Sequence, residues 1–164
     1  MRIIVDAYGG DNAPEAVLRG CRMAADQWKC EIILTGDGEK LRARATELGV
    51  SLEGMTIAEA PDVFPMEAEP TAIMKQYKDS SMARGLQMLA EGGGEAFVSA
   101  GSTGALHVGA SLIVRTLKGI KRPALATMVP AKKQAYLLLD CGANVECRPE
   151  MLAAFAVMGS CYVN

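Results

Sequence analysis

Short apolar runs and amphipathic stretches alternate along this chain. Ile3-Ile4-Val5 has the pattern of a buried strand, and Pro14 then opens a predicted helix with Asp11 or Asn12 as its N-cap. The apolar face of that helix consists of Val17, Cys21, Ala24 and Trp28. The apolar runs predict strands over residues 2–6, 31–35, 55–58, 95–100, 125–129 and 135–140. Further helices are predicted over 39–48, 71–77, from Ser80 or Ser81 to the glycines at 92–94, over 104–118, and from Pro149 onward.

This alternation predicts a layered α/β/α fold with a mostly parallel sheet. The strands at 125–129 and 135–140 are the exception, because their connection is too short for a parallel crossover and favours an antiparallel pair. No repeat, low-complexity tract or flexible linker divides the sequence. We therefore expect a single α/β domain over residues 1–164. The last helix has no C-terminal stop signal, so we also expect the chain to be truncated.

Composition narrows the class of protein without identifying it. Half of the 164 residues are apolar and 5% are aromatic, so Val, Ile, Leu, Ala and Met must build the core, as in helix-covered parallel sheets. The net charge of −2 excludes a basic field that could hold nucleic acid. The five cysteines include no CxxC pair, and the first residues do not resemble a signal peptide. Both features indicate reduced thiols in the cytoplasm.

Glycine-rich or small polar segments follow four of the strands. They cover residues 6–11, 35–38, 99–105 and 140–144. Ligands of parallel sheets collect beyond the carboxyl ends of the strands, so each segment is a candidate site. Segment 99–105 is the most informative, because its small residues admit an anion, its hydroxyls are donors and a helix N-terminus follows. A tight turn without a ligand fits the same spacing, and both GxxxxGK[ST] and GxGxxG are absent.

The segment Lys78-Asp79-Ser80-Ser81 is a second candidate for phosphate binding. A lysine and two hydroxyls precede a predicted helix, although Asp79 or Ser80 acting as a plain N-cap explains most of the pattern.

Two carboxylates, Asp6 and Asp140, each close an apolar strand. An ionised carboxylate in such a place needs a partner, and we expect both to accept hydrogen bonds from loop backbone.

Two residues that invite a catalytic reading have plainer interpretations. His107 is the only histidine, but without a GxSxG elbow a triad with Ser102 has no support, so we expect His107 to be packed or solvent-facing. Cys141 follows a strand end, yet no base accompanies it, so we interpret it as a small structural thiol.

Six segments in order resemble one family. Residues 6–14 read DAYGGDNAP, similar to DAMGGDxAP; 78–82 read KDSSM; 99–106 read SAGSTGAL, similar to SAGNTGAL; 119–125 read GIKRPAL, similar to GIxRPAL; 140–144 read DCGAN, similar to DxGAN; and Pro149 with 155–160, FAVMGS, matches the helix that follows. Together they resemble the N-terminal half of the bacterial phosphate acyltransferase family known as PlsX. The chain departs from the family pattern at Tyr8, Ser102 and His107, where Met, Asn and an apolar residue are usual.

This resemblance implies a fold like isocitrate and isopropylmalate dehydrogenases, shared with phosphotransacetylase. It implies that inorganic phosphate and the thioester of an acyl carrier protein give acyl phosphate for phospholipid synthesis, with no cofactor and no metal. It also implies a cytoplasmic homodimer associated with the membrane surface. On the matching motifs we expect catalytic roles for Lys78, Ser81 and Asn144. We expect phosphate or substrate binding by Gly9, Gly10, Asp11, Ser80, Ser99, Gly101, Ser102, Thr103, Gly104, Asp140 and Gly142.

The implied chemistry suits these residues. Phosphate is already a nucleophile at neutral pH and a thiol is a good leaving group, so the protein need only cradle phosphate, place the thioester and stabilise the oxyanion. Two alternatives stay open. The chain could be an inert fragment that still binds phosphate or a partner, or a phosphotransacetylase-like or dehydrogenase relative. The lack of an acidic cluster spaced for a divalent metal disfavours the metal-dependent dehydrogenases.

Overall fold

The computed structural model describes residues 1–163, and the chain divides into two compact units, Met1–Arg115 and Thr116–Asn164. The sequence predicted one domain over its whole length. That single domain stays a prediction. The last two described strands pair only with each other, so no strand pairing joins them to the first sheet. Each unit is therefore described by itself. No helix within residues 1–163 is long and apolar enough to cross a membrane.

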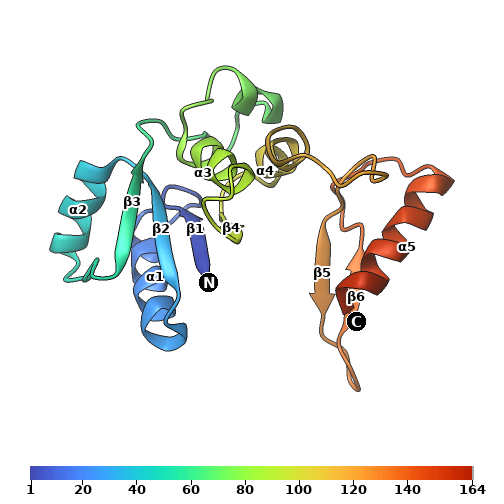
Figure 1. Ribbon diagram of the computed structural model, residues 1–164, viewed down its shortest axis with the longest axis horizontal. Coiled ribbons are helices and arrows are strands. Elements are labelled where there is room, and N and C mark those ends of the chain that lie inside the picture. The colour runs from blue at the N-terminus through green and yellow to red at the C-terminus, as the bar shows by residue number, and fades with distance from the viewer. Residues whose placement is uncertain (164) are drawn as a thin grey trace. The chain divides into compact units, whose positions relative to one another are not determined.

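The first unit is built on a four-stranded parallel sheet (Figure 1). Its strands are β1 (Arg2–Asp6), β2 (Glu31–Gly36), β3 (Met55–Glu59) and β4 (Ala96–Val98), in the order β3-β2-β1-β4. The register places Asp6 beside Thr35, and Val5 beside both Leu34 and Val98. The predicted α/β fold with a mostly parallel sheet is confirmed.

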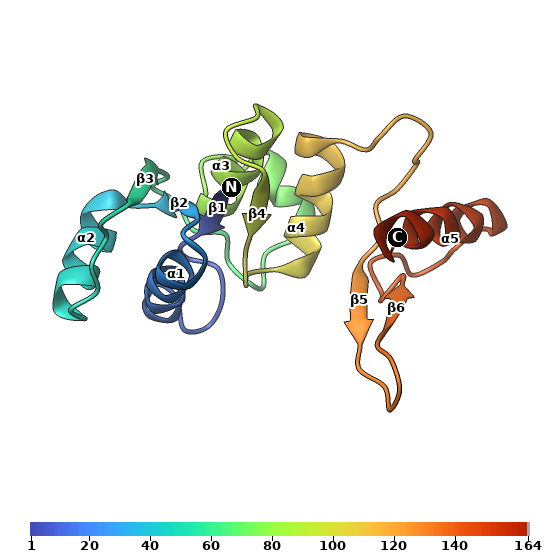
Figure 2. The same ribbon diagram turned by 60° about the horizontal axis from the view of Figure 1, so that its bottom comes forward.

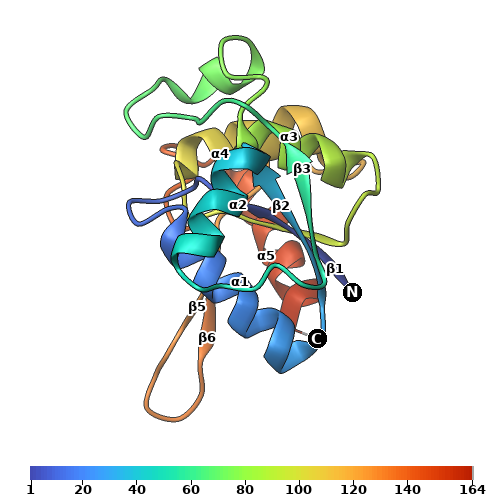
Figure 3. The ribbon, with the colours of Figure 1, turned by 90° about the vertical axis from the view of Figure 1, so that its left-hand side faces the viewer.

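Helices cover both faces of this sheet (Figure 3). The helices of the first unit are α1 (Glu15–Trp28), α2 (Gly38–Glu47), the 3₁₀ helix η1 (Pro70–Met74), α3 (Ser81–Ala90), α4 (Thr103–Gly109) and the π-helix η2 (Ala110–Val114). Side chains on a strand alternate between the two faces. Val5 and Leu34 accordingly pack with α1 and α2, whereas the hydroxyl of Thr35 bonds to the carbonyl of Ser81 at the start of α3.

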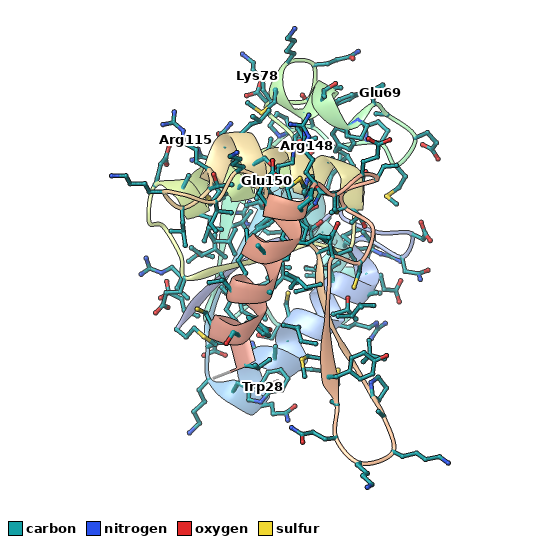
Figure 4. All side chains as sticks on the ribbon, turned by 90° about the vertical axis from the view of Figure 1, so that its right-hand side faces the viewer. Trp28, Glu69, Lys78, Arg115, Arg148 and Glu150 are labelled. Carbon is teal, nitrogen blue, oxygen red and sulfur yellow. The ribbon has the colours of Figure 1, made fainter. Side chains whose placement is uncertain are left out.

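Several local expectations are corrected by the structure. The N-cap of α1 is Pro14 and carries no side-chain cap, so neither Asp11 nor Asn12 caps this helix. The helix expected over 104–118 ends at Val114, because Arg115 has φ 72° and leaves the right-handed region. Trp28, expected on the core face, is the last residue of α1 and is 67% exposed (Figure 4).

The second unit consists of one hairpin and one helix (Figure 2). Strands β5 (Ala126–Val129) and β6 (Tyr136–Leu139) pair antiparallel, as the short connection predicted. The helix α5 (Pro149–Val163) packs against β6 and buries Phe155 alone among its residues. An apolar groove of about 820 Å³ lies between β6 and α5.

Candidate functional site

The strand order reverses direction beside β1. The chain runs outward from β1 through β2 to β3, and then returns to place β4 on the other side of β1. In open parallel sheets this switch point leaves a crevice beyond the carboxyl ends of the two strands. The segments that follow β1 and β4 are the predicted loops 6–11 and 99–105, so the fold brings two of the four candidate loops together.

Asp6 fixes the geometry at this point. Its side chain is 2% exposed, with Oδ1 accepting from the Tyr8 N–H at 3.2 Å and Oδ2 accepting from the Ser99 hydroxyl at 2.7 Å. The Ser99 oxygen in turn accepts from the Gly101 N–H at 3.0 Å. The expectation that Asp6 binds loop backbone is confirmed, and the structure adds Ser99 as its side-chain partner.

Gly9 permits the two loops to meet. A Cβ on Gly9 would lie 2.6 Å from Ser99 Oγ, 2.7 Å from Asp6 Oδ2 and 2.9 Å from the Gly101 nitrogen. Contacts this short are not tolerated, so only glycine allows this approach. Gly10 follows with φ 101° against Ala100, and Asp11 is exposed next to it.

Loop 99–105 leads directly into α4. Ser102 is 8% exposed and caps the helix, its oxygen accepting from the Ala105 N–H at 3.4 Å. Thr103 and Gly104 are exposed in the first turn, where backbone N–H groups have no partner inside the helix. The oxygen of Ser102 is therefore engaged within the protein, while Thr103 and Gly104 face solvent.

The segment 78–82 reaches the same region through its last residues. Ser80 caps α3, as predicted, accepting from the Ala83 N–H at 3.3 Å. Ser81 is 1% exposed, and its N–H donates to the Asp62 carbonyl at 2.9 Å. Met82 packs against Gly101, whose Cβ would lie 2.9 Å from the Met82 methyl group. Lys78 is exposed (Figure 4).

Asp140 organises the loop after β6 in the second unit. Oδ1 accepts from the N–H groups of Leu125 at 2.7 Å and Ala143 at 3.4 Å, and Oδ2 accepts from the Asn144 N–H at 2.7 Å. Burial alone would raise the pKa of Asp140, but these hydrogen bonds hold that pKa below its ordinary value. The expected role in binding loop backbone is confirmed here too. Gly142 takes φ 99°, a conformation that the turn requires and glycine adopts freely.

Asn144 is held by the same loop. It is 8% exposed, and its Nδ2 donates to the Pro123 carbonyl and to Asp140 Oδ2, both at 3.2 Å. Its Oδ1 is buried and has no hydrogen-bond partner among residues 1–163. The catalytic role expected for Asn144 stays a prediction, as do those expected for Lys78 and Ser81.

The structural contacts of Thr35, Tyr8 and Met82 were not predicted from the sequence. Thr35 links β2 to α3 through the Ser81 carbonyl, and a threonine ending an apolar strand was the available signal. The Tyr8 ring packs on Gly36, and burial together with the nearby Asp37 carboxylate raises the pKa of its hydroxyl, which Lys40 partly offsets. All five cysteines are free, and Cys141 donates its S–H to the Leu138 carbonyl at 3.3 Å.

Two solved phosphotransacetylases share the fold of this chain. The EutD phosphotransacetylase from Staphylococcus aureus matches with a TM-score of 0.72 and 22% identity, over 96% of this chain and 51% of that chain. A phosphotransacetylase from Streptococcus pyogenes matches with a TM-score of 0.72, 24% identity and the same coverage. At these identities the likeness concerns the fold alone.

Residues 1–164 match the family described as fatty acid synthesis protein, and the chain belongs to that family. A phosphate acyltransferase of Pelotomaculum thermopropionicum is 44% identical over 164 residues, covering 99% of this chain and 47% of the relative. A phosphate acyltransferase of Caldicellulosiruptor bescii is 44% identical over 165 residues, covering 100% of this chain and 49% of the relative. The resemblance drawn from the six motifs is confirmed. The chain spans about half the length of the curated relatives it matches.

Proposed function

We propose that this chain supplies the phosphate-binding part of a phosphate acyltransferase that works in phospholipid synthesis. The observation that carries the proposal is the Ser99–Asp6 hydrogen bond at the switch point of the sheet, in a chain whose relatives are named phosphate acyltransferases. The bond ties loops 6–11 and 99–105 together, so that small residues and a helix N-terminus border one crevice.

The proposed reaction joins inorganic phosphate to an acyl group carried as a thioester on acyl carrier protein. A phosphate oxygen attacks the thioester carbonyl carbon, and a tetrahedral oxyanion forms. The carbon–sulfur bond then breaks, releasing acyl phosphate and the thiolate of the carrier, which takes a proton from solvent. No residue of the protein needs to form a covalent bond.

We assign the phosphate contact to the exposed first turn of α4. Thr103 offers a hydroxyl, and the N–H groups of Thr103 and Gly104 lie where the helix dipole favours an anion. Gly9, Gly10, Ser99 and Gly101 let the two loops approach each other, and Asp11 is exposed beside Gly10. Ser80 and Ser102 support these loops as helix caps.

We propose that the remaining expected residues act on the thioester substrate. Lys78 lies just before α3 and Ser81 is its first residue, and this helix packs on loop 99–105 through Met82. Asp140, Gly142 and Asn144 form one hydrogen-bonded loop of the second unit. We propose that this loop contributes to oxyanion stabilisation in the assembled enzyme.

The proposal extends to partners and location. Acyl carrier protein and inorganic phosphate are the substrates, and the family resemblance supports a cytoplasmic homodimer that associates with the membrane periphery. Five free thiols are compatible with a reducing compartment. The net charge of −2 gives no support for a nucleic-acid partner.

A chimera tests this function. Residues 1–164 replace the matching residues of the Caldicellulosiruptor bescii relative, and thiol release from acyl carrier protein is followed with and without phosphate. We expect phosphate-dependent release, with acyl phosphate detected by hydroxylamine trapping. A folded chimera that releases no thiol, beside an active parental relative, would refute the assignment.

Two other classes are separated by the same assay. Because the chain spans about half of its relatives, we expect the isolated chain to bind phosphate without turnover, as an inert fragment would. A phosphotransacetylase-like activity would use the thioester of coenzyme A in place of acyl carrier protein. Running both thioesters on the chimera decides between these substrates.

A further inference from the structure

The two units differ in charge. Residues 116–164 contain six Lys and Arg against three Asp and Glu, a net charge of +3, whereas residues 1–115 contain eleven against sixteen, a net charge of −5. The overall value of −2 conceals this division. The second unit is thus a basic body within an acidic chain, and its field favours an anionic partner.

Three of these cations line one pocket of the second unit. The pocket has a volume of about 620 Å³, and Lys121, Arg122 and Arg148 lie on its wall. Arg148 immediately precedes α5, where Figure 4 labels it beside Glu150. Glu146 and Glu150 also line the pocket, so its side chains carry a net charge of +1, to which the N-terminus of the fifteen-residue α5 adds a partial positive charge.

These cations are unpaired within the part of the chain that the structure describes. Among residues 1–163 no ion pair or side-chain hydrogen bond involves Lys121, Arg122 or Arg148, although two glutamates share their pocket. Arg22 and Arg44 of the first unit, by contrast, each pair with a carboxylate. Unpaired guanidinium groups in a pocket are suited to a phosphate, which arginine binds through two parallel N–H donors.

The wall of the same pocket also contains a neutral hydrogen-bond acceptor. Asn144 lines the pocket and is fixed by two hydrogen bonds through Nδ2, while its Oδ1 is buried and accepts no hydrogen bond from residues 1–163. An unsatisfied buried acceptor is unfavourable in the free chain, and a ligand N–H would satisfy it. The pocket therefore combines cations for a phosphate with an acceptor for an amide.

We propose that this pocket binds the phosphopantetheine arm on which acyl carrier protein holds its thioester. The arm combines an anionic phosphate with amide N–H groups, which is the pairing of features that the pocket wall presents. The inference rests on the proposed function, because it places the thioester substrate of that reaction. It assigns Lys121, Arg122 and Arg148 to the phosphate of the arm, and it leaves inorganic phosphate to the first turn of α4.

Binding to the intact chain tests the proposal without turnover. Phosphopantetheine, pantetheine and inorganic phosphate are each titrated calorimetrically into residues 1–164. We expect phosphopantetheine to bind at least about tenfold more tightly than pantetheine, which lacks the phosphate. Arg122→Gln with Arg148→Gln should abolish that advantage, because two phosphate donors are lost.

The control variant is Lys132→Gln with Lys133→Gln. It removes the same charge from the same unit at the β5–β6 connection, away from the pocket, and should leave phosphopantetheine binding unchanged. Both pairs are exposed, so circular dichroism should show both variants folded.

Three results would overturn the proposal. They are equal binding of phosphopantetheine and pantetheine, an equal loss in both double variants, and phosphopantetheine binding no tighter than inorganic phosphate at the same residues. Failure of the proposed function is distinguishable. In that case the chimera releases no thiol while the Arg122/Arg148-dependent binding of phosphopantetheine persists.

Discussion

Ser99 and Asp6 lie 93 residues apart in the sequence and share a hydrogen bond of 2.7 Å between Oγ and Oδ2. Ser99→Ala removes a donor from a carboxylate that is 2% exposed. We expect the free energy of unfolding to fall by about 1–3 kcal/mol in urea denaturation, because a buried acceptor loses its partner.

The matched control for that substitution is Ser111→Ala. The Ser111 hydroxyl donates to the His107 carbonyl within the same turn of helix, so its removal should change stability by less than about 0.5 kcal/mol. If both variants unfold at the same urea concentration, the Ser99–Asp6 bond does not hold the switch point together.

Thr103 and Ser102 should separate phosphate binding from helix capping. Thr103→Val removes an exposed hydroxyl and should weaken phosphate binding severalfold, measured calorimetrically, with little loss of stability. Ser102→Ala removes a buried N-cap and should cost about 0.5–2 kcal/mol of stability. Unchanged phosphate binding in a folded Thr103→Val chain would place the phosphate elsewhere.

The Asp140 loop should give stability a pH dependence of known sign. Because the folded pKa of Asp140 is lowered, its contribution is complete above the ordinary value of 3.8 and is lost as pH falls through the folded pKa. We expect Asp140→Asn to cost about 1 kcal/mol at pH 7, allowing for partial solvent screening. The gap between parent and variant should shrink only below pH 3.8. A gap that is constant from pH 7 to pH 3 would contradict this account.

Cys141→Ala should leave acyl transfer by the chimera within a few-fold of the parent. The Cys141 S–H is engaged by the Leu138 carbonyl, as expected of a small structural thiol. Thiol release from acyl carrier protein measures the effect, and circular dichroism checks folding. A loss of activity by orders of magnitude in a folded variant would indicate covalent catalysis through this residue.

The second unit should self-associate through α5. Leu152, Val157 and Tyr162 are 54%, 63% and 69% exposed on this helix. Among the apolar residues Leu152, Phe155, Ala156 and Met158 of this helix, only Phe155 is buried. Exposed apolar side chains gathered on one helix favour association.

Light scattering over a concentration series tests that expectation. Leu152→Glu with Val157→Lys should shift the chain toward monomer, while Val145→Glu, at a fully exposed position outside α5, should not. A parent chain that stays monomeric at every concentration would contradict the prediction.

Local features were predictable from the sequence because they depend on neighbouring residues. Ser80 as a cap follows from the residues beside it, and loop binding by Asp6 and Asp140 follows from the position of each at a strand end. The division into two units was not predictable, because strands at 126–129 and 136–139 fit a larger sheet equally well by pattern. The early end of the helix at Val114 depends on Arg115 taking φ 72°, for which the sequence carries no signal.

The candidate site was predictable in its parts and not in its arrangement. Spacing identifies loops 6–11 and 99–105 as glycine-rich strand ends, but it cannot tell which strands are neighbours. That β4 lies beside β1, rather than beyond β3, is what brings Ser99 to Asp6 and makes Gly9 indispensable. The basic pocket was not predictable from the sequence, because its residues come from two segments and the overall charge is negative.

The position of β4 also has a consequence for the order of folding. Strand β1 pairs on one side with β2, which is the next strand along the chain. Its other side pairs with β4, where Ile4 lies opposite Phe97, and that pairing can form only after β4 has been made. Closing so long a loop is entropically costly and slow compared with local pairing. During synthesis the edge of β1 that pairs with β4 therefore stays unpaired until nearly a hundred residues have left the ribosome. The junction of β1 and β4 is the last part of this sheet to form, so a defect that delays β4 delays the candidate site before it disturbs the remaining strands.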